Sequence, residues 1–282
     1  MEIGIVTLPT DRSAPIVELA RAIESRGLAS LYVGGDHTHI PTARTTPFPG
    51  GGDLPDEYTR TLDPIVALTA AAVCTERIRL GTAIYLSAQR DAIDTAKKVA
   101  SLDFLAQGRV DFGVGYGWNV EEAADHGVVW KTRRSLVREQ VLAMKQLWTA
   151  EQAEYHGEHV SFGASVMRPK PVSRPHPRVL VGASPGPRSF AAIADWADGW
   201  FPVPFWGHTP ADVQRLREVA ADAGRDPASL AIVVDGVLPD PSMLDPWHEI
   251  GAEAALVAVP SEPLDSIEPA LDAAAALVER YR

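Results

Sequence analysis

The chain has 282 residues, of which 46% are hydrophobic and 22% are charged, so it can bury a large core and disorder is not expected. Its net charge of −11 argues against nucleic acid or an anionic membrane as a general partner, although a local basic pocket for one phosphate is compatible with it. The single cysteine, Cys74, excludes an internal disulfide and fits a reducing compartment. The sequence shows no signal peptide and no apolar run near the ~20 residues of a membrane helix, so we expect a cytoplasmic protein.

The first elements alternate between strand and helix. Ile3–Leu8 is rich in β-branched residues and predicts a strand. Apolar residues from Ile16 to Ile23 then follow helical spacing, and Gly27 suits the left-handed position that ends a helix. Ser30–Val33 predicts the second strand.

Directly after the second strand the chain reads GGDHTH, which includes His37 and His39. His37 at a strand end is a candidate general acid or base, because imidazole titrates near neutral pH. The spacing of the two histidines also invites a metal site. Hydrolases with such a pair need further histidines and an aspartate at other strand ends, where this chain has Gly182-Ala183 and Val259-Pro260. We therefore predict no metal.

An insertion rich in proline, glycine and threonine spans Thr38–Thr61. It follows a strand, so it belongs to the carboxyl-terminal face of the predicted sheet, where a lid and an ordinary loop are both compatible with its composition. Asp63-Pro64 then predicts the start of a helix, because proline is tolerated at the first helical position. Ile78–Leu86 predicts the third strand.

The stretch GRVDFGVGYGWN, which ends at Asn119, contains the fourth strand and a glycine-rich turn. Val110–Val114 alternates as a barrel strand does, and Gly115 and Gly117 follow it. Glycine there lets backbone approach a ligand closely and offers N–H groups to an anion. The spacing is not that of the dinucleotide fingerprint, whose third glycine would fall at Val120. A phosphate site and tight packing at the strand end both remain open.

Three arginines in the helical segment after this turn, Arg133, Arg134 and Arg138, could add positive charge. Most arginines on such a segment are solvated, so we expect about one of the three to matter. A second insertion, Glu154–Pro175, contains a predicted hairpin around His156-Gly157-Glu158.

After this insertion the chain reads VGASPGPR, from Val181 to Arg188. The fifth strand, Val179–Val181, ends there, Ser184-Pro185 resembles a helix cap, and Arg188 falls in the first turn. A helix N-terminus with a guanidinium group nearby is an anion site. A routine strand–helix turn is the alternative.

Three more strands follow, and Thr209-Pro210 predicts the start of another helix. These strands are Gly199–Val203, Leu230–Gly236 and Ala254–Ala258. Eight strands, each followed by a helix, predict an α/β protein with a closed (β/α)8 barrel of the TIM type, in one domain from residue 1 to 282. An open doubly wound sheet is the structural alternative.

Taken together, these segments resemble the luciferase-like flavin and deazaflavin oxidoreductases, especially the actinobacterial group that uses coenzyme F420. The resemblance extends along nearly the whole chain, with its landmarks in order, and implies a luciferase-like barrel. The landmarks are GGDH at Gly34–His37, ERIRLGTAIYL at Glu76–Leu86, LDFLAQGRVDFGVGYGWN at Leu102–Asn119, PKPVSRPHPRVLVGA at Pro169–Ala183 and ADGWFP at Ala197–Pro202.

The resemblance implies a deazaflavin or flavin mononucleotide (FMN) across the carboxyl-terminal mouth of the barrel. Asp36 would contact the ring or a hydroxyl, and His37 would face the reacting carbon. The bond Ala83–Ile84 matches a non-prolyl cis peptide of many relatives. The tail phosphate would lie between the two turns described above. The implied cofactor-binding residues are Asp36, Ala83, Ile84, Gly115, Tyr116, Gly117, Trp118, Asn119, Arg138, Gly182, Ala183, Ser184, Gly186 and Arg188.

One residue departs from the resemblance. In the deazaflavin-dependent sugar-phosphate dehydrogenases, a glutamate that serves as an acid follows the glycine-rich turn, and this chain has Trp118 there. Proton transfer then rests on His37 or on the substrate itself, and a sugar phosphate is disfavoured as substrate. Trp118, Trp200, Phe205 and Trp206 indicate a more apolar pocket, with core packing as the alternative for each.

The resulting hypothesis is an F420-dependent oxidoreductase that moves a hydride between the cofactor and a small organic substrate. The first alternative is an FMN-dependent monooxygenase that receives reduced flavin from a separate reductase. The second is a non-enzymatic flavin-binding protein, because a fold does not determine a function. We also expect a homodimer, since the relatives are often dimers and the outer helices carry apolar residues.

Overall fold

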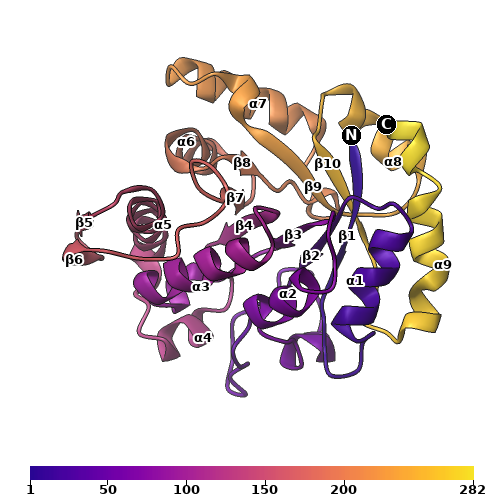
Figure 1. The fold of residues 1–282 in the computed structure, drawn as a ribbon, viewed down its shortest axis with the longest axis horizontal. Coiled ribbons are helices and arrows are strands. Elements are labelled where there is room, and N and C mark those ends of the chain that lie inside the picture. Colours follow the sequence, from indigo (N-terminus) through magenta and orange to yellow (C-terminus); the bar gives the residue numbers. More distant parts are fainter.

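Eight parallel strands close into a barrel in the computed structural model, which describes residues 1–282 (Figure 1). Around the barrel the order is β1, β10, β9, β8, β7, β4, β3 and β2, so β2 pairs with β1. This confirms the predicted (β/α)8 barrel and excludes the open sheet. The strands are β1 Glu2–Thr7, β2 Ser30–Val33, β3 Arg79–Thr82, β4 Val110–Gly115, β7 Arg178–Gly182, β8 Gly199–Trp200, β9 Ala231–Val237 and β10 Ala254–Ala258.

Helices surround the barrel and cover its outer face (Figure 1). No helix combines the length and apolarity needed to cross a bilayer. The helices are α1 Ile16–Ser25, α2 Pro64–Ala72, α3 Ala92–Leu105, α4 Val120–Asp125, α5 Arg133–Thr149, α6 Pro187–Trp196, α7 Pro210–Asp222, α8 Pro241–Glu249, α9 Leu264–Ala275 and α10 Val278–Tyr281.

Several predicted helix boundaries are confirmed. Asp63 caps α2, and its carboxylate accepts hydrogen bonds from the first-turn N–H groups. Thr209 and Asp212 form a capping box at the start of α7. Gly27 has φ +74° just after α1. The predicted cap at Ser184 is wrong, because α6 begins at Pro187 with Gly186 as its N-cap.

Two strands are shorter than predicted. β3 ends at Thr82 instead of Leu86, and beyond it only Tyr85 pairs, with Val114. The Ala83–Ile84 peptide bond is cis, as the resemblance implies. β8 has only two residues, since Pro202 and Pro204 lack the N–H groups that a continued ladder requires. Periodicity alone shows neither event.

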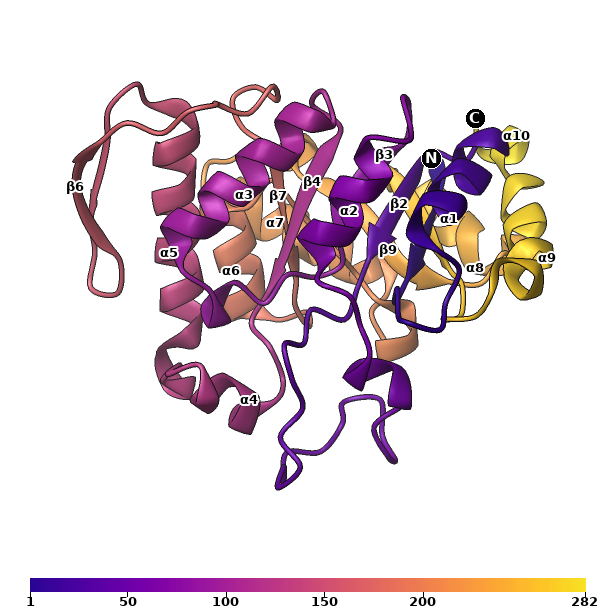
Figure 2. The ribbon, with the colours of Figure 1, turned by 60° about the horizontal axis from the view of Figure 1, so that its bottom comes forward.

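The two insertions leave the barrel at different places (Figure 2). The segment between β2 and α2 lies at the same end of the barrel as α4, and contains a short 3₁₀ helix, η1, over Asp56–Thr59. The later insertion forms the predicted hairpin, with β5 Ala153–His156 antiparallel to β6 Ser161–Ser165 beside α5.

A few large side chains fill the barrel lumen opposite glycines. A Cβ added to Gly81 would lie 2.0 Å from the Tyr32 ring, and one added to Gly113 would lie 2.6 Å from the Phe201 ring. Tyr32 and Phe201 pack edge to face, with centroids 5.6 Å apart. The lumen therefore needs glycine at these positions, because the rings occupy the space that a side chain would take.

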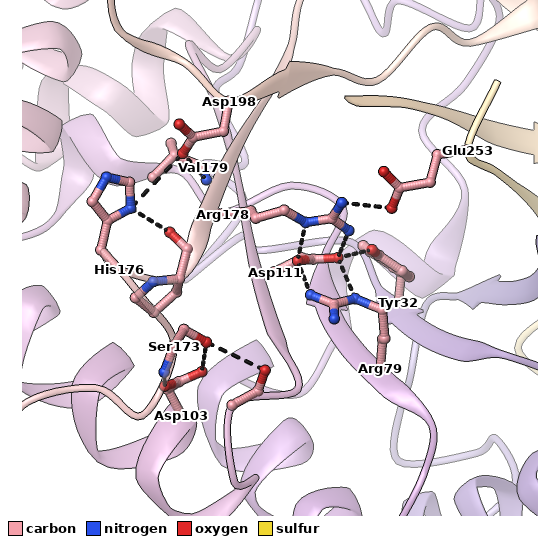
Figure 3. A network of polar contacts seen from close by, with 12 residues as sticks. Tyr32, Arg79, Asp103, Asp111, Ser173, His176, Arg178, Val179, Asp198 and Glu253 are labelled. Carbon is pink, nitrogen blue, oxygen red and sulfur yellow. Dashed lines mark hydrogen bonds and ion pairs between the residues drawn. The ribbon is translucent and has the colours of Figure 1, made fainter. Parts of the chain in front are cut away.

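Below this layer, the buried carboxylate of Asp111 closes the amino-terminal end of the barrel (Figure 3). Arg178 binds it through Nε at 2.9 Å and Nη2 at 2.7 Å, Arg79 binds it as well, and the Tyr32 hydroxyl donates at 2.5 Å. Burial alone would raise the pKa of Asp111, but the hydrogen bonds and charges of the two arginines outweigh it and lower the pKa to about 2.

We predict that Asp111→Asn lowers the free energy of unfolding by about 3 kcal/mol at pH 7, because it leaves two guanidinium groups without their shared anion. A carboxylate with a lowered pKa stabilises the fold above its ordinary pKa and loses that effect as the pH falls. The difference between wild type and variant should therefore shrink between about pH 4 and pH 2. Urea unfolding followed by circular dichroism measures it, with exposed Asp222→Asn as the control. A difference below about 1 kcal/mol at pH 7 contradicts the prediction.

Candidate cofactor site

The candidate site is a cavity of about 880 Å³ over the carboxyl-terminal ends of the strands, which we call the mouth. Active sites of this fold lie at that end. Of the residues predicted from the sequence, ten line the mouth: Asp36, His37, Ala83, Ile84, Tyr116, Gly117, Trp118, Gly182, Ala183 and Ser184. Because these ten residues line the mouth, they can contact a ligand there. Their roles in binding a cofactor or in catalysis stay predictions.

Five other predicted residues do not line the mouth. A Cβ on Gly115 would lie 2.3 Å from the Ile84 side chain, so this glycine permits packing in the lumen. Buried Asn119 caps α4, accepting the Glu122 N–H at 3.3 Å. Arg138 pairs with Asp195 at 2.7 Å on the outer surface. The remaining two are Gly186, the N-cap of α6, and exposed Arg188 in its first turn.

The aromatic residues divide between mouth and core. Phe205 and Trp206 line the mouth and are more than half exposed. Trp200 is fully buried, and its indole N–H donates to the Ala183 carbonyl at 2.9 Å. Core packing is thus the role of Trp200, whereas the other two make one wall of the mouth apolar.

Asp36 is held in place at the edge of the mouth. Its carboxylate accepts the Leu86 N–H at 2.7 Å and pairs with Arg90. Burial raises the pKa of Asp36 to about 7, although Arg90 and the Leu86 N–H lower it. Both oxygens already have protein partners, so Asp36 fixes the turn after Ala83–Ile84 as well as facing the cavity.

His37 has a partner on each ring nitrogen. Its Nδ1 lies 2.6 Å from Oε2 of Glu122, and its Nε2 lies 3.2 Å from the indole Nε1 of Trp118. An indole N–H only donates, so Nε2 of His37 is the acceptor and Nδ1 carries the proton that it donates to Glu122. The two partners fix the tautomer and the orientation of the ring.

Sequence reasoning missed Glu122, which has no exposed surface. A signal was present, because Asn119 and Glu122 have the spacing of a cap and its third helical residue. In a capping box the glutamate returns to the cap residue; here Oε2 meets His37 and Oε1 accepts the Thr38 N–H at 3.2 Å. Nothing in the local sequence shows that the loop after β2 supplies the partners.

The neighbouring Glu121 holds the same loop from outside. Its Oε1 accepts the N–H and the hydroxyl of Thr45, each at 2.7 Å, and its Oε2 accepts the Thr46 hydroxyl at 2.5 Å. The Thr46 and Thr45 hydroxyls and the Thr45 N–H lower the pKa of Glu121 to about 2. His39 adds an exposed contact, with Nε2 3.0 Å from Asp125. The two histidines whose spacing invites a metal therefore bind different carboxylates of α4.

Held in this way, the loop covers part of the mouth. Phe48 packs against Trp118 and Tyr58, with ring centroids 5.8 Å and 5.1 Å away. Tyr58 in turn lies 5.6 Å from the His37 ring. All four residues line the mouth, so the loop adds an aromatic wall that limits the access of water.

Two arginines of α5 line the mouth without any carboxylate partner: Arg133 and Arg134. The Arg134 guanidinium lies 4.3 Å from the centre of the Tyr116 ring, and that of Arg133 lies 3.6 Å from the Trp130 ring. Nε of Arg133 is buried and has no hydrogen-bond partner. Buried donors are normally paired, so these groups fit an anionic part of a ligand.

A second cavity, of about 440 Å³, lies at the opposite, amino-terminal end of the barrel. Arg178 there pairs with Asp111 and Glu253 (Figure 3), and Asp198 lies 3.4 Å from Lys145, whereas Arg174 and Arg217 bind backbone carbonyl groups. This end of the barrel serves stability, so the mouth is the better candidate for function.

Residues 1–238 match the sequence profile of the family described as luciferase-like monooxygenase, and the chain belongs to this family. An uncharacterized protein of Mycobacterium tuberculosis is 44% identical over 283 residues, which cover 99% of this chain and 97% of that protein. An FMNH2-dependent dimethylsulfone monooxygenase of Pseudomonas putida is 31% identical over 134 residues, 45% of this chain and 36% of that protein.

Solved structures agree on the fold. The monooxygenase RslO1 from Streptomyces bottropensis superposes with a TM-score of 0.81 at 23% identity, covering all of both chains. An F420-dependent secondary alcohol dehydrogenase superposes with a TM-score of 0.77 at 18% identity, covering 100% of this chain and 99% of that one. The protein is thus a luciferase-like oxidoreductase or monooxygenase. The proteins similar to it include an FMNH2-dependent enzyme by sequence and an F420-dependent enzyme by fold.

We predict that Glu121→Gln loosens the loop after β2. Glutamine is a neutral and weaker acceptor for the Thr45 and Thr46 donors, so exchange of their amide hydrogens should rise about tenfold or more. Hydrogen exchange followed by mass spectrometry measures this, and Glu249→Gln, at an exposed position without these contacts, is the matched control. Equal protection in both variants would show that the carboxylate does not hold the loop.

Proposed function

We propose that this protein is an F420-dependent oxidoreductase that transfers a hydride between the deazaflavin and a small organic substrate. The observation that carries the proposal is the pair Arg133 and Arg134, two cations without counter-charges beside the turns at Gly117 and Gly182–Ser184. Coenzyme F420 has a phosphodiester and a tail of glutamyl carboxylates, whereas FMN ends in a single phosphate. Two unpaired guanidinium groups fit the more extended anion better.

The residues of the mouth would each contribute to holding this cofactor. Arg133 and Arg134 would bind the anionic tail, and the Ala83–Ile84 bond would lie against the ring. Phe48, Tyr58 and Trp118 would exclude water from the ring, which in the bound state supplies the hydride chemistry. His37 would face the substrate side with its orientation fixed by Glu122.

A second candidate is an FMN-dependent monooxygenase that uses reduced flavin and oxygen. It is supported by the family description and by the P. putida relative, whose name specifies FMNH2. Such an enzyme would need a separate reductase as a partner. A flavin-binding protein without activity would keep the arginine pair but need no ordered group facing the substrate.

A homodimer is also part of the proposal. Large apolar side chains are exposed on α2 and at α3, where an ordinary helix surface would be polar. They are Val66, Ile93, Phe104 and Leu105 within the helices, and Leu62 and Val73 next to α2. A second copy of the chain would remove them from water, as homodimer interfaces do.

The function is tested by titrating the purified protein with reduced F420 and, separately, with reduced FMN under exclusion of oxygen. Fluorescence of the cofactor or of the tryptophans near the mouth reports binding. We expect saturable binding of F420 at least tenfold tighter than that of FMN. Tight binding of FMN alone would overturn the proposal in favour of the monooxygenase, and binding of neither would contradict both enzymes.

A second experiment tests the arginine pair. Arg134→Gln should weaken F420 binding about tenfold or more and reduce its dependence on salt, because one charge facing the anion is lost. Arg138→Gln is the matched control, because it removes the same charge from the same helix, but from a surface pair with Asp195. A larger loss in Arg138→Gln would place the anion site outside the mouth.

A further inference from the structure

The carboxyl group of Asp235 has no protein partner at the carboxyl-terminal end of β9. No side chain and no backbone N–H donates to it, and no cation pairs with it. Among the acidic groups near the mouth this is unusual, since Asp36 binds Arg90 and Glu122 binds His37. A carboxylate that is largely shielded from water and has no partner is unfavourable, so such a group either binds a ligand or is protonated.

The register of β9 places this side chain inside the barrel. Asp235 lies beside Leu256 of β10, and Val233 lies beside Ala254. Val233, Ala254 and Leu256 belong to the layer that fills the lumen with Tyr32 and Phe201. Residues two apart on a strand face the same side, so Asp235 also points inward, one layer nearer the mouth.

The same end of β9 carries a β-bulge. Leu256 pairs with Asp235 and Val257 with Val237, which leaves Gly236 as the extra residue with φ +73°. A Cβ on Gly236 would lie 3.9 Å from the ring of Phe205, a residue of the mouth. β-Bulges at barrel rims change the direction of the side chains next to them. The bulge at Gly236 follows directly after Asp235, at the rim of the barrel.

Asp235 is partly accessible, and the lumen layer beneath it is filled. It does not itself line the mouth, but it lies near Tyr58 and, through Gly236, next to Phe205, both of which do. Burial raises the pKa of Asp235 to about 7, and no charged group opposes this. The nearby titratable group is Tyr58, whose pKa is raised by burial and by the charges of Glu57 and Asp235. The ring of Tyr58 lies 5.6 Å from that of His37.

We propose that Asp235 is a ligand-binding and proton-exchanging residue at the inner edge of the mouth, whose protonated carboxyl group donates a hydrogen bond to an oxygen or nitrogen atom of the bound ligand. This inference rests on the proposed function for the identity of that ligand. When the proton moves, the carboxyl O–H bond breaks, a bond from hydrogen to the ligand atom forms, and the carboxylate regains a proton from water through the mouth. His37 is less free for this exchange, because both of its ring nitrogens have partners.

The first test uses the protein without a ligand. In carbon-13 spectra of protein labelled at the aspartate carboxyl groups, one resonance that titrates near neutral pH should disappear in Asp235→Asn. It should persist in Asp222→Asn, the exposed control. Asp235→Ser provides a second variant if the asparagine variant fails to fold. If no neutral resonance is lost in a folded variant, Asp235 is an ordinary acid and the proposal is overturned.

The second test uses oxidised F420 as the probe and calorimetry in two buffers of different ionisation enthalpy. A ligand that accepts a hydrogen bond from the protonated carboxyl group raises its pKa further, so binding near pH 7.5 should take up protons in wild type and in Asp222→Asn. Asp235→Asn should bind within about threefold of wild type, because its amide still donates, but without this uptake. Any protons taken up or released by the cofactor itself are the same for all three proteins, so they cancel when the proton uptake of the variants is compared with that of wild type.

The outcomes separate the two proposals. If wild type binds neither F420 nor FMN, the proposed function is overturned. If F420 binds and Asp235→Asn takes up as many protons as wild type, the function stands and the role of Asp235 is overturned. If the wild-type affinity falls about tenfold between pH 6 and pH 8.5 and that of Asp235→Asn falls less, the carboxyl group faces the ligand.

Discussion

The filling of the barrel lumen is the constraint on which the rest of the structure depends. An eight-stranded barrel has room for only a few large side chains, and here rings from β2 and from the residue after β8 occupy it. Opposite these rings, Gly81 and Gly113 have no space for a side chain. Because the lumen is packed and its lower end is closed by Asp111, the barrel interior has no room for a ligand, and the cavity of about 880 Å³ lies above it at the mouth.

This constraint changes the meaning of the glycine-rich stretch in β4. Gly113 and Gly115 face inward and permit the approach of Phe201 and Ile84, so packing accounts for them. Gly117 lies beyond the strand, has φ +71° and lines the mouth. One stretch of sequence thus combines lumen packing with a turn at the candidate cofactor site, and residue spacing cannot separate the two uses.

The fold could be predicted from the sequence because the signals that indicate its strands and helices are local. The alternation of β-branched runs with amphipathic segments, and caps such as Asp63 and Thr209, each report on a few neighbouring residues. The resemblance added the position of the Ala83–Ile84 cis bond. The part of the site that escaped prediction depends on distant segments: Glu122 meets His37 across 85 positions, and only the closed barrel brings them together.

The arginines show the same limit within a single helix. Arg134 and Arg138 lie one turn apart on α5, and their sequence context does not distinguish them. The structure places Arg134 over Tyr116 in the mouth and Arg138 against Asp195 outside it. The direction of a helix relative to the barrel decides this, and that direction is set by tertiary packing.

Two kinds of polar group therefore lie in or beside the mouth, and they suit different tasks. His37 is held on both nitrogens, so its geometry is defined but its exchange of protons requires a partner to leave. Asp235 is held by nothing, so its proton is available but its orientation awaits a ligand. A site that orders a substrate with one group and exchanges a proton with another would need both, and the aromatic wall of Phe48 and Tyr58 narrows the access of water on the side of His37.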